Sequence, residues 1–214
     1  DLENDRYIEV WNIVFSQYDC RPGEVDRHEY KELPQKNIDT GMGLERLVCL
    51  IQDGETNFDT DLFLPIIHAT EQYAKHSYSE KEYKMAYRVI ADHIRTVTFA
   101  IADGAMFSNE GRGYVLRRVL RRAVRYGIKL GIDGAFMYKL VKVVADNMIA
   151  YYPYVQEKVA LIEKLVKQEE ESFHKTLANG EALLQDALAE HADSKILPGE
   201  VMFKLYDTYG YPKE

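Results

Sequence analysis

The first part of the chain follows a strand-like pattern of apolar and polar positions. The run Tyr7–Phe15 is apolar on both alternating faces, and only Asn12 interrupts it. Two apolar faces indicate a strand inside a larger sheet, since a strand at a solvated edge carries polar side chains on one face. Residues 36–39 predict a second, short strand, and the polar stretch 19–36 predicts the connection. Two strands do not form a stable sheet alone, so we expect the rest of it to come from residues outside this chain, a partner chain or a rearrangement.

The remainder of the chain follows a helical period. Four apolar residues at spacing i, i+3, i+4 and i+7 predict a helix that begins at Gly41 and buries one face: Leu44, Leu47, Val48 and Ile51. From residue 61 onward we expect helices over 61–76, 80–102, 113–130, 134–150 and 155–190. The last of these would carry on roughly one side Leu161, Leu165, Phe173, Leu177, Leu184 and Leu188.

These elements predict an α+β chain with a division near residue 58. Residues 1–58 would form part of a sheet domain, residues 59–197 a mostly α-helical domain, and residues 198–214 the start of a following segment. The first five residues lack the basic and apolar stretches of a signal peptide, and the chain lacks a starting methionine. We therefore expect a piece of a longer chain, or a processed protein.

Charge is distributed unevenly along the chain. The net charge of the 214 residues is −8, yet Met85–Leu130 carries nine Lys/Arg against three Asp/Glu. Pro153–Asp193 carries four against nine. A basic island in an acidic chain is compatible with RNA binding, while the acidic remainder keeps the protein soluble.

Composition argues against several classes of protein. No run of about 18 apolar residues occurs, so we expect no membrane span. The only cysteines, Cys20 and Cys49, form no CxxC pair and no zinc-ligand spacing with the six histidines. We therefore expect reduced thiols in a cytoplasmic protein and no metal site in this chain.

Two glycines and an arginine stand where the second strand leads into a helix, in the stretch Asp39–Arg46 (DTGMGLER). Gly41 and Gly43 let a ligand approach the backbone, whose free N–H groups favour anions. Arg46 lies about 200° round the helix from Leu44, away from the apolar face, where its guanidinium can hold a phosphate or stack on a base. An ordinary turn into a surface helix remains the alternative for this pattern alone.

A more specific pattern is the arginine-rich helix that follows Ser108. On a helical wheel its apolar residues occupy one half and its arginines the other, with no acidic residue among them. The arginines of this face are Arg117, Arg118, Arg121, Arg122 and Arg125. Bound phosphates would relieve their mutual repulsion and release counterions. The alternatives are a solvated face, or one paired with Glu169, Glu170 or Glu171.

The lead-in to this helix is polar and contains glycine. The side-chain amide of Asn109 can donate to and accept from a base edge, and the glycines permit close approach. A plain helix cap is the other interpretation of Asn109.

These stretches together resemble the alanyl-tRNA synthetase family of class II aminoacyl-tRNA synthetases. The matching segments run in family order: YIEVWNIVF (7–15), IDTGMGLERL (38–47), NFDTDLF (57–63), RVIADHIR to RRAVR (88–125) and FKLYDTYGYP (203–212). The resemblance implies the C-terminal part of a class II antiparallel sheet that carries motif 3, joined to a helical domain that binds the tRNA acceptor stem.

The resemblance also implies roles for particular residues. Arg46 would be the catalytic arginine, and the ATP-binding residues would be Val10, Trp11, Asn12, Gly43 and Arg46. The alanine-binding residues would be Asn12, Asp39 and Gly41, with Asp39 on the ammonium group. The acceptor stem, with its G·U wobble pair, would be read by Asn109 and Asp207 and gripped by Arg112, Arg117, Arg118, Arg121, Arg122 and Arg125.

On this resemblance the parent enzyme activates L-alanine with ATP, accompanied by Mg²⁺, and transfers it to tRNA(Ala). Motifs 1 and 2 and the zinc-binding editing domain have no counterpart in this sequence, so we expect the chain alone to be inactive. Two other functions stay open: a non-catalytic synthetase-like RNA-binding module, and an interaction domain whose basic helix meets an acidic protein.

Overall fold

A computed structural model describes residues 7–20, 23, 26–191 and 196–209 of the protein. The chain divides into two compact units, residues 1–62 and residues 63–214. The first contains an antiparallel pair of strands and a short helix, and the second is helical. The expected α+β class is therefore confirmed.

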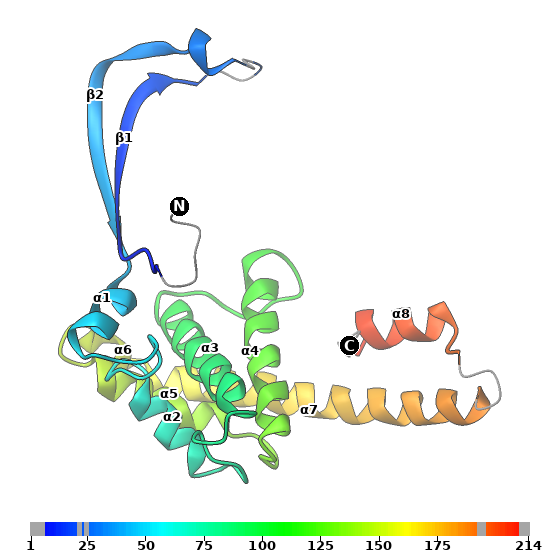
Figure 1. Cartoon of the computed structure of the whole chain (residues 1–214). Helices are drawn as coiled ribbons and strands as arrows, with labels where there is room; N and C mark the ends of the chain where they lie inside the picture. Colours follow the sequence, from blue (N-terminus) through cyan, green and yellow to red (C-terminus); the bar gives the residue numbers. More distant parts are fainter. Residues whose placement is uncertain (1–6, 21–22, 24–25, 192–195, 210–214) are drawn as a thin grey trace. The chain divides into compact units, whose positions relative to one another are not determined.

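The first unit is a long β-hairpin that leads into a helix (Figure 1). Strand β1 (Trp11–Asp19) pairs with β2 (Lys31–Met42), and a short 3₁₀ helix η1 (Arg27–Glu29) lies in the connection. The register is regular from Trp11 opposite Met42 to Ser16 opposite Asn37, and an irregularity follows. Helix α1 (Leu44–Ile51) begins directly after the extended N-cap residue Gly43.

Strand boundaries differ from those that the pattern predicted. The first strand begins at Trp11 and not at Tyr7, and the second extends over twelve residues where a short strand was expected. The predicted connection 19–36 is too long at its second end, because the polar residues from Lys31 onward pair across to β1. Charged side chains on a two-stranded ribbon face water on both sides, so they do not prevent pairing.

The predicted buried face of α1 is wrong for this chain. Leu44 is 57% exposed and Ile51 is 74% exposed, and the helix contains no buried residue. β1 is similarly uncovered, with Trp11 at 62% exposure. Apolar periodicity identifies the face that needs cover; it does not supply the cover, and no described residue does so.

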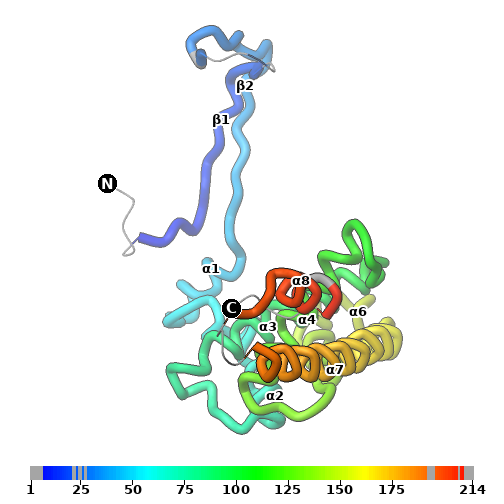
Figure 2. Tube along the Cα trace, turned by 90° about the vertical axis from the view of Figure 1, so that its right-hand side faces the viewer, coloured from blue at the N-terminus to red at the C-terminus, as the bar shows by residue number. Residues whose placement is uncertain are grey.

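The second unit is built from seven helices among its described residues. They are α2 (Leu64–Glu71), α3 (Lys84–Ala102), α4 (Gly111–Lys129), α5 (Met137–Met148), α6 (Pro153–Glu157), α7 (Val159–Glu190) and α8 (Gly199–Asp207). Helix α3 packs on α4, α5 packs on α7, and α8 contacts α7. Figures 1 and 2 show α7 as the long helix that passes along α4 and α5. The core between them holds fully buried Tyr87, Ile90, Ile94, Leu120, Met137, Leu140, Ile162 and Phe173.

The predicted leucine stripe of α7 is only partly right. Phe173 is buried, but Leu161 and Leu188 are exposed. The buried positions are Ile162, Val166, Glu169, Glu170, Phe173, Gly180 and Ala187. Small and acidic residues occupy part of the face that packs against the other helices. A stripe drawn through the leucines alone therefore lies partly on the exposed side of α7.

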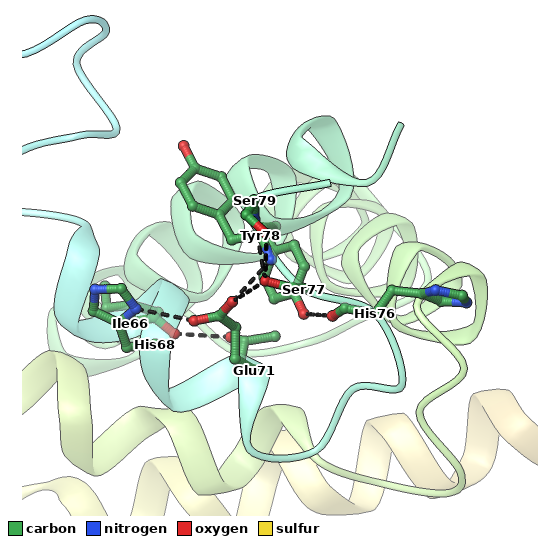
Figure 3. Close-up of polar contacts among 9 residues, drawn as sticks. Ile66, His68, Glu71, His76, Ser77, Tyr78 and Ser79 are labelled. Carbon is green, nitrogen blue, oxygen red and sulfur yellow. Dashed lines mark hydrogen bonds and ion pairs between the residues drawn. The ribbon is translucent and has the colours of Figure 1, made fainter. Parts of the chain in front are cut away.

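The loop between α2 and α3 is held by one carboxylate (Figure 3). Glu71 accepts hydrogen bonds from the Ser77 hydroxyl at 3.1 Å and from the backbone N–H of Tyr78 at 2.8 Å, and its other oxygen lies 3.0 Å from His68 Nδ1. Burial raises the pKa of Glu71, but these hydrogen bonds outweigh burial and hold the pKa below its usual value. Because Ser77 bonds the carboxylate and not the imidazole, the cluster orders the loop and contains no activated nucleophile.

Candidate functional site

The hairpin brings three predicted residues to one face. Asn12 pairs directly with Gly41, and Asp39 lies two residues before Gly41 in β2, opposite Val14. Alternate residues of a strand point to the same face, so Asn12, Gly41 and Asp39 share it. A directly opposed pair has its Cβ positions about 5 Å apart and a diagonal pair about 7–8 Å. The spacing suits a ligand as small as an amino acid.

Gly41 leaves room on this face. A Cβ built at Gly41 would meet no atom within 4 Å, so the space opposite Asn12 is open among the described residues. The Asp39 carboxylate is exposed and accepts a hydrogen bond from the backbone N–H of Thr40 at 2.7 Å through one oxygen. Its other oxygen can accept from a ligand ammonium, because a carboxylate carries several acceptor positions.

Gly43 and Arg46 brace the residues that precede β1. The backbone N–H of Gly43 donates to the Val10 carbonyl at 3.1 Å, and an Arg46 guanidinium N–H donates to the Glu9 carbonyl. A Cβ at Gly43 would lie 3.3 Å from the Arg46 side chain, so glycine allows that side chain to lie close to the helix start. The structure thus brings Val10, Gly43 and Arg46 together.

Trp11 lies on the opposite face of the hairpin from Asn12. Its indole N–H donates to the Thr40 hydroxyl, which in turn donates to the Asn12 backbone carbonyl at 2.9 Å. The Trp11 side chain therefore points to the other face of the hairpin from Asn12, Gly41 and Asp39.

Helix α4 carries its arginines in two rows. The inner row, Arg117 and Arg121, faces α7 and is partly buried. Both guanidinium groups meet Glu169 Oε1: Arg121 Nη2 at 2.8 Å and Nε at 2.9 Å, and Arg117 Nε at 3.0 Å. The Arg117 Nε–H does not point at the oxygen, so this contact is an ion pair and not a hydrogen bond. For this row the alternative that the sequence left open, pairing with Glu169, is confirmed.

The inner row also packs on an aromatic ring. The Arg121 guanidinium carbon lies 4.9 Å from the centre of the Phe173 ring, one turn along α7 from Glu169. Arg121 is thus held by charge and by ring contact. We assign it to the packing of α4 on α7 before any contact with a ligand.

The outer row faces solvent. Arg112, Arg118, Arg122 and Lys129 are exposed and Arg125 is partly exposed. Within the described ranges no Asp or Glu forms an ion pair with any arginine of this row. Arg118 and Arg122 each lie 6.0 Å from a tyrosine ring of the same helix, Tyr114 and Tyr126 respectively. Phosphates along this row would meet cations that form no ion pair with a described carboxylate.

Asp92 on α3 is an acidic group that interacts electrostatically with Arg122 of this row. A hydrogen bond with His93 holds the pKa of Asp92 below its usual value against the opposing effect of burial, and Arg95 and Arg122 add to the lowering. Asp92 therefore stays ionised near neutral pH, and it offsets the potential of the outer row only locally.

The loop before α4 presents Asn109. The N-cap of α4 is Glu110, without a side-chain cap, so the helix-cap interpretation of Asn109 is wrong. Instead, Asn109 Oδ1 accepts a hydrogen bond from the Arg117 guanidinium. Gly111 has φ +59°, and a Cβ at Gly113 would lie 2.2 Å from the Met106 carbonyl oxygen, so glycine is required for the loop to fold back on the helix start. Neither spacing nor composition indicated the Asn109–Arg117 bond.

The other predicted base reader is Asp207. It is the last residue of α8, and its side chain lies outside what the structure describes.

Glu170, which the sequence offered as a possible partner of the arginine face, instead binds the start of α5. Glu170 is fully buried, and its oxygens accept the backbone N–H groups of Phe136 and Met137 at 2.9 and 3.1 Å, at the start of α5. Burial raises the pKa of Glu170 to about 7, although these hydrogen bonds oppose the rise. Successive acids on α7 thus hold α4 and α5 in place.

Metal and membrane sites receive no support from the described residues. Over residues 7–20, 23, 26–191 and 196–209, no group of three or more His, Cys, Asp or Glu is arranged to hold a metal ion. In the same ranges no helix combines the length and the apolar character needed to cross a membrane.

Comparison with known proteins gives one consistent family. A family model described as "tRNA synthetases class II (A)" matches residues 1–214. The chain is 58% identical to the alanine–tRNA ligase of Geobacillus kaustophilus, over 99% of this chain and 24% of that protein. It is 56% identical to the alanine–tRNA ligase of Streptococcus mutans, over 100% of this chain and 25% of that protein. The chain spans about a quarter of the length of these relatives.

Proposed function

The chain belongs to the class II (A) tRNA synthetases, and from that premise we propose that it is part of an alanine–tRNA ligase. Its first unit would contribute to the site that activates L-alanine with ATP. Its helical unit would bind the acceptor stem of tRNA(Ala). The observation that carries the proposal is identity of 56–58% to alanine–tRNA ligases along essentially the whole chain.

The shared face of the hairpin supports the alanine site. Asn12, Gly41 and Asp39 meet there, with open space over Gly41. Asp39 supplies the negative charge that an α-ammonium group requires, and Asn12 supplies an amide. Glycine at position 41 leaves room for the backbone of a bound amino acid to approach the strand.

The start of α1 supports the nucleotide site. Gly43 and Arg46 lie against the backbone of Glu9 and Val10, and the Arg46 side chain is exposed. Arg46 would exchange its backbone carbonyl for ATP phosphate oxygens or lie on the adenine ring. A guanidinium is suited to either role. Mg²⁺ would accompany ATP, but no described acidic cluster holds it, and we assign it no step.

The outer row of α4 supports the RNA site. Arg112, Arg118, Arg122 and Arg125 would contact phosphates, whereas Asn109 and Asp207 would read the G·U pair. Phosphate contacts position a duplex and base contacts specify it. The division of the chain after Leu62 supports separate units for the two tasks, close to the expected boundary at residue 58. A cytoplasmic location would accompany this role in translation.

The test uses the full-length protein and two assays. Alanine-dependent exchange of pyrophosphate into ATP should be lost by at least a hundredfold in Asp39→Asn and in Arg46→Ala. An acceptor-stem hairpin with G·U should bind more tightly than one with G·C, and Asn109→Ala should remove the difference. RNA binding without any exchange would overturn the ligase and favour a non-catalytic RNA-binding module. Absence of both would overturn the proposal entirely.

A further inference from the structure

Three residues on two helices and a loop form a continuous polar chain. Glu169 on α7 is 7% exposed and meets Arg117 and Arg121 on α4 through a single oxygen, Oε1. Arg117 reaches on from Glu169 and donates to Asn109 Oδ1 in the loop before α4. A buried carboxylate thus connects through one guanidinium to an exposed amide.

The chemistry of the guanidinium determines which end of the amide it binds. Arginine has N–H donors and no acceptor, so of the two ends of the Asn109 amide it can hydrogen-bond only to the oxygen. The amide nitrogen of Asn109 is then the end that points elsewhere, and it is a donor. No described residue takes a hydrogen bond from that nitrogen.

Glu169 makes this arrangement specific. An arginine on a helix surface has many rotamers, and ordering such a side chain costs conformational entropy. Here the ion pair to Glu169 at 3.0 Å fixes the Arg117 side chain before any ligand arrives. Arg121 contacts the same oxygen through both Nη2 and Nε, so Glu169 cannot turn away without breaking several contacts.

We propose that Glu169 and Arg117 are positioning residues for base recognition: together they hold the Asn109 amide so that it offers an N–H donor to a base of the acceptor stem. This inference rests on the proposed function of Asn109. A donor at that point favours uracil, whose O4 accepts, over cytosine, whose N4 amino group donates. Exchange of G·U for G·C replaces the O4 acceptor of the pyrimidine with an N4 amino donor.

The test is a double-mutant cycle in the full-length protein with the two acceptor-stem hairpins. The measured quantity is the ratio of the Kd for G·C to the Kd for G·U, with Tm as a check on folding. We expect Glu169→Gln to lower the ratio by at least about fivefold, within the range that one base contact contributes. Glu171→Gln is the matched control, since Glu171 lies two residues along the same helix and contacts Lys167; it should leave the ratio unchanged.

Two further variants distinguish a role of Glu169 in positioning the Asn109 amide from a role in stabilising the fold. If Glu169 acts through the amide, Glu169→Gln in an Asn109→Ala background should change the ratio by less than twofold. Arg117→Lys retains the positive charge but loses the fork that reaches both partners, so it should also lower the ratio while Tm stays within a few degrees. This second variant keeps the test decisive if Glu169→Gln does not fold.

The outcomes distinguish the two levels of the argument. Discrimination that Asn109→Ala abolishes but neither Glu169→Gln nor Arg117→Lys changes would overturn the positioning role alone. Equal weakening of both hairpins, with an unchanged ratio, would do the same and show that Glu169 only supports the fold. No discrimination in the wild-type protein would overturn both the positioning role and the proposed reading by Asn109.

Discussion

At the scale of single residues, one glycine of α4 makes room for the buried ring of Phe136, which precedes α5. A Cβ at Gly127 would lie 2.3 Å from Cε1 and 2.6 Å from Cζ of Phe136, a fully buried ring. Overpacking of this kind costs about 1–3 kcal/mol, against a gain of about 1 kcal/mol from replacing a helical glycine with alanine. We therefore expect Gly127→Ala to lower the free energy of unfolding by up to about 2 kcal/mol.

Denaturant unfolding checks this prediction. Gly199→Ala is the control, because a Cβ at Gly199 meets nothing within 4 Å and its φ is not in the left-handed region. That variant should be neutral or slightly stabilising. Equal stability of the Gly127 and Gly199 variants would show that the Phe136 ring moves aside without cost.

The buried Glu170 carboxyl predicts how stability changes with pH. Its pKa is about 7 in the folded protein and close to its ordinary value of 4.5 in the unfolded chain, so the folded state binds the extra proton between these values. Stability due to Glu170 is therefore complete below about pH 4.5 and is lost as pH rises through 7, by roughly 3 kcal/mol. Glu170→Gln should remove this loss, so it should be clearly more stable than wild type at pH 8 and similar to it at pH 5.

His174 also changes stability with pH, so the test compares the wild-type protein with Glu170→Gln at each pH. Burial lowers the pKa of His174, so its neutral form is favoured on folding and its contribution increases as pH rises towards 6.5. This opposes Glu170 in the wild-type curve, but it is common to both proteins and cancels in their difference. A difference between wild type and Glu170→Gln that does not vary with pH would contradict the raised pKa.

At the scale of elements, the two rows of α4 should respond differently to mutation. Arg118→Gln and Arg122→Gln remove exposed charges without an ion-pair partner in the described ranges, so stability should change by less than about 0.5 kcal/mol. Each should weaken binding of both hairpins about equally and lower the slope of log K against log salt by about one unit. Arg121→Gln breaks the pair with Glu169 and the Phe173 contact, so it should lower stability by about 1–3 kcal/mol, less than for a fully buried pair.

Salt-series titration and thermal unfolding on the same variants measure both effects. A loss of stability in Arg118→Gln equal to that in Arg121→Gln would contradict the division into rows. If both outer-row variants kept the wild-type slope of log K against log salt, the assignment of phosphate contacts to α4 would be wrong.

The elements also show what the sequence predicts well. The helical period located every helix from α2 to α5 and the long α7, because each buries an apolar stripe within this chain. It missed the break at Lys158 between α6 and α7, where the polar residue lies between two helical runs. The period also failed to identify the inward face of α7, where Glu169 and Glu170 are buried because α4 and the start of α5 supply their partners.

The candidate site follows the same division. The sequence predicts two neighbouring strands, but it does not give the register that brings Asn12 opposite Gly41. A shift of one residue would move every side chain to the other face. The Asn109–Arg117 bond joins residues eight apart through a loop that folds back at Gly111, and no local spacing rule predicts such a contact. Contacts between elements therefore required the structure, whereas local amphipathicity did not.

At the scale of the whole molecule, the two units differ in how much apolar surface they bury. The helical unit contains all the fully buried large side chains of the described chain. The hairpin unit leaves β1 and α1 apolar and uncovered, although their sequences are those of interior elements. The two units therefore have unequal local stability in this chain, and the hairpin requires additional cover if it is to form the proposed alanine and ATP site.

Hydrogen exchange tests this difference directly. In the isolated chain of residues 1–214, amides of β1 and β2 should exchange within minutes, because a lone two-stranded ribbon is marginally stable in water. Amides in the buried turns of α3 and α5 should be protected for at least a hundred times longer. In the full-length protein the hairpin amides should become protected and alanine activation should appear, whereas the isolated chain should show neither. Slow exchange of the hairpin in the isolated chain would mean that β1 and β2 are stable without further cover, and the expected inactivity of the chain would then need another cause, such as missing catalytic residues.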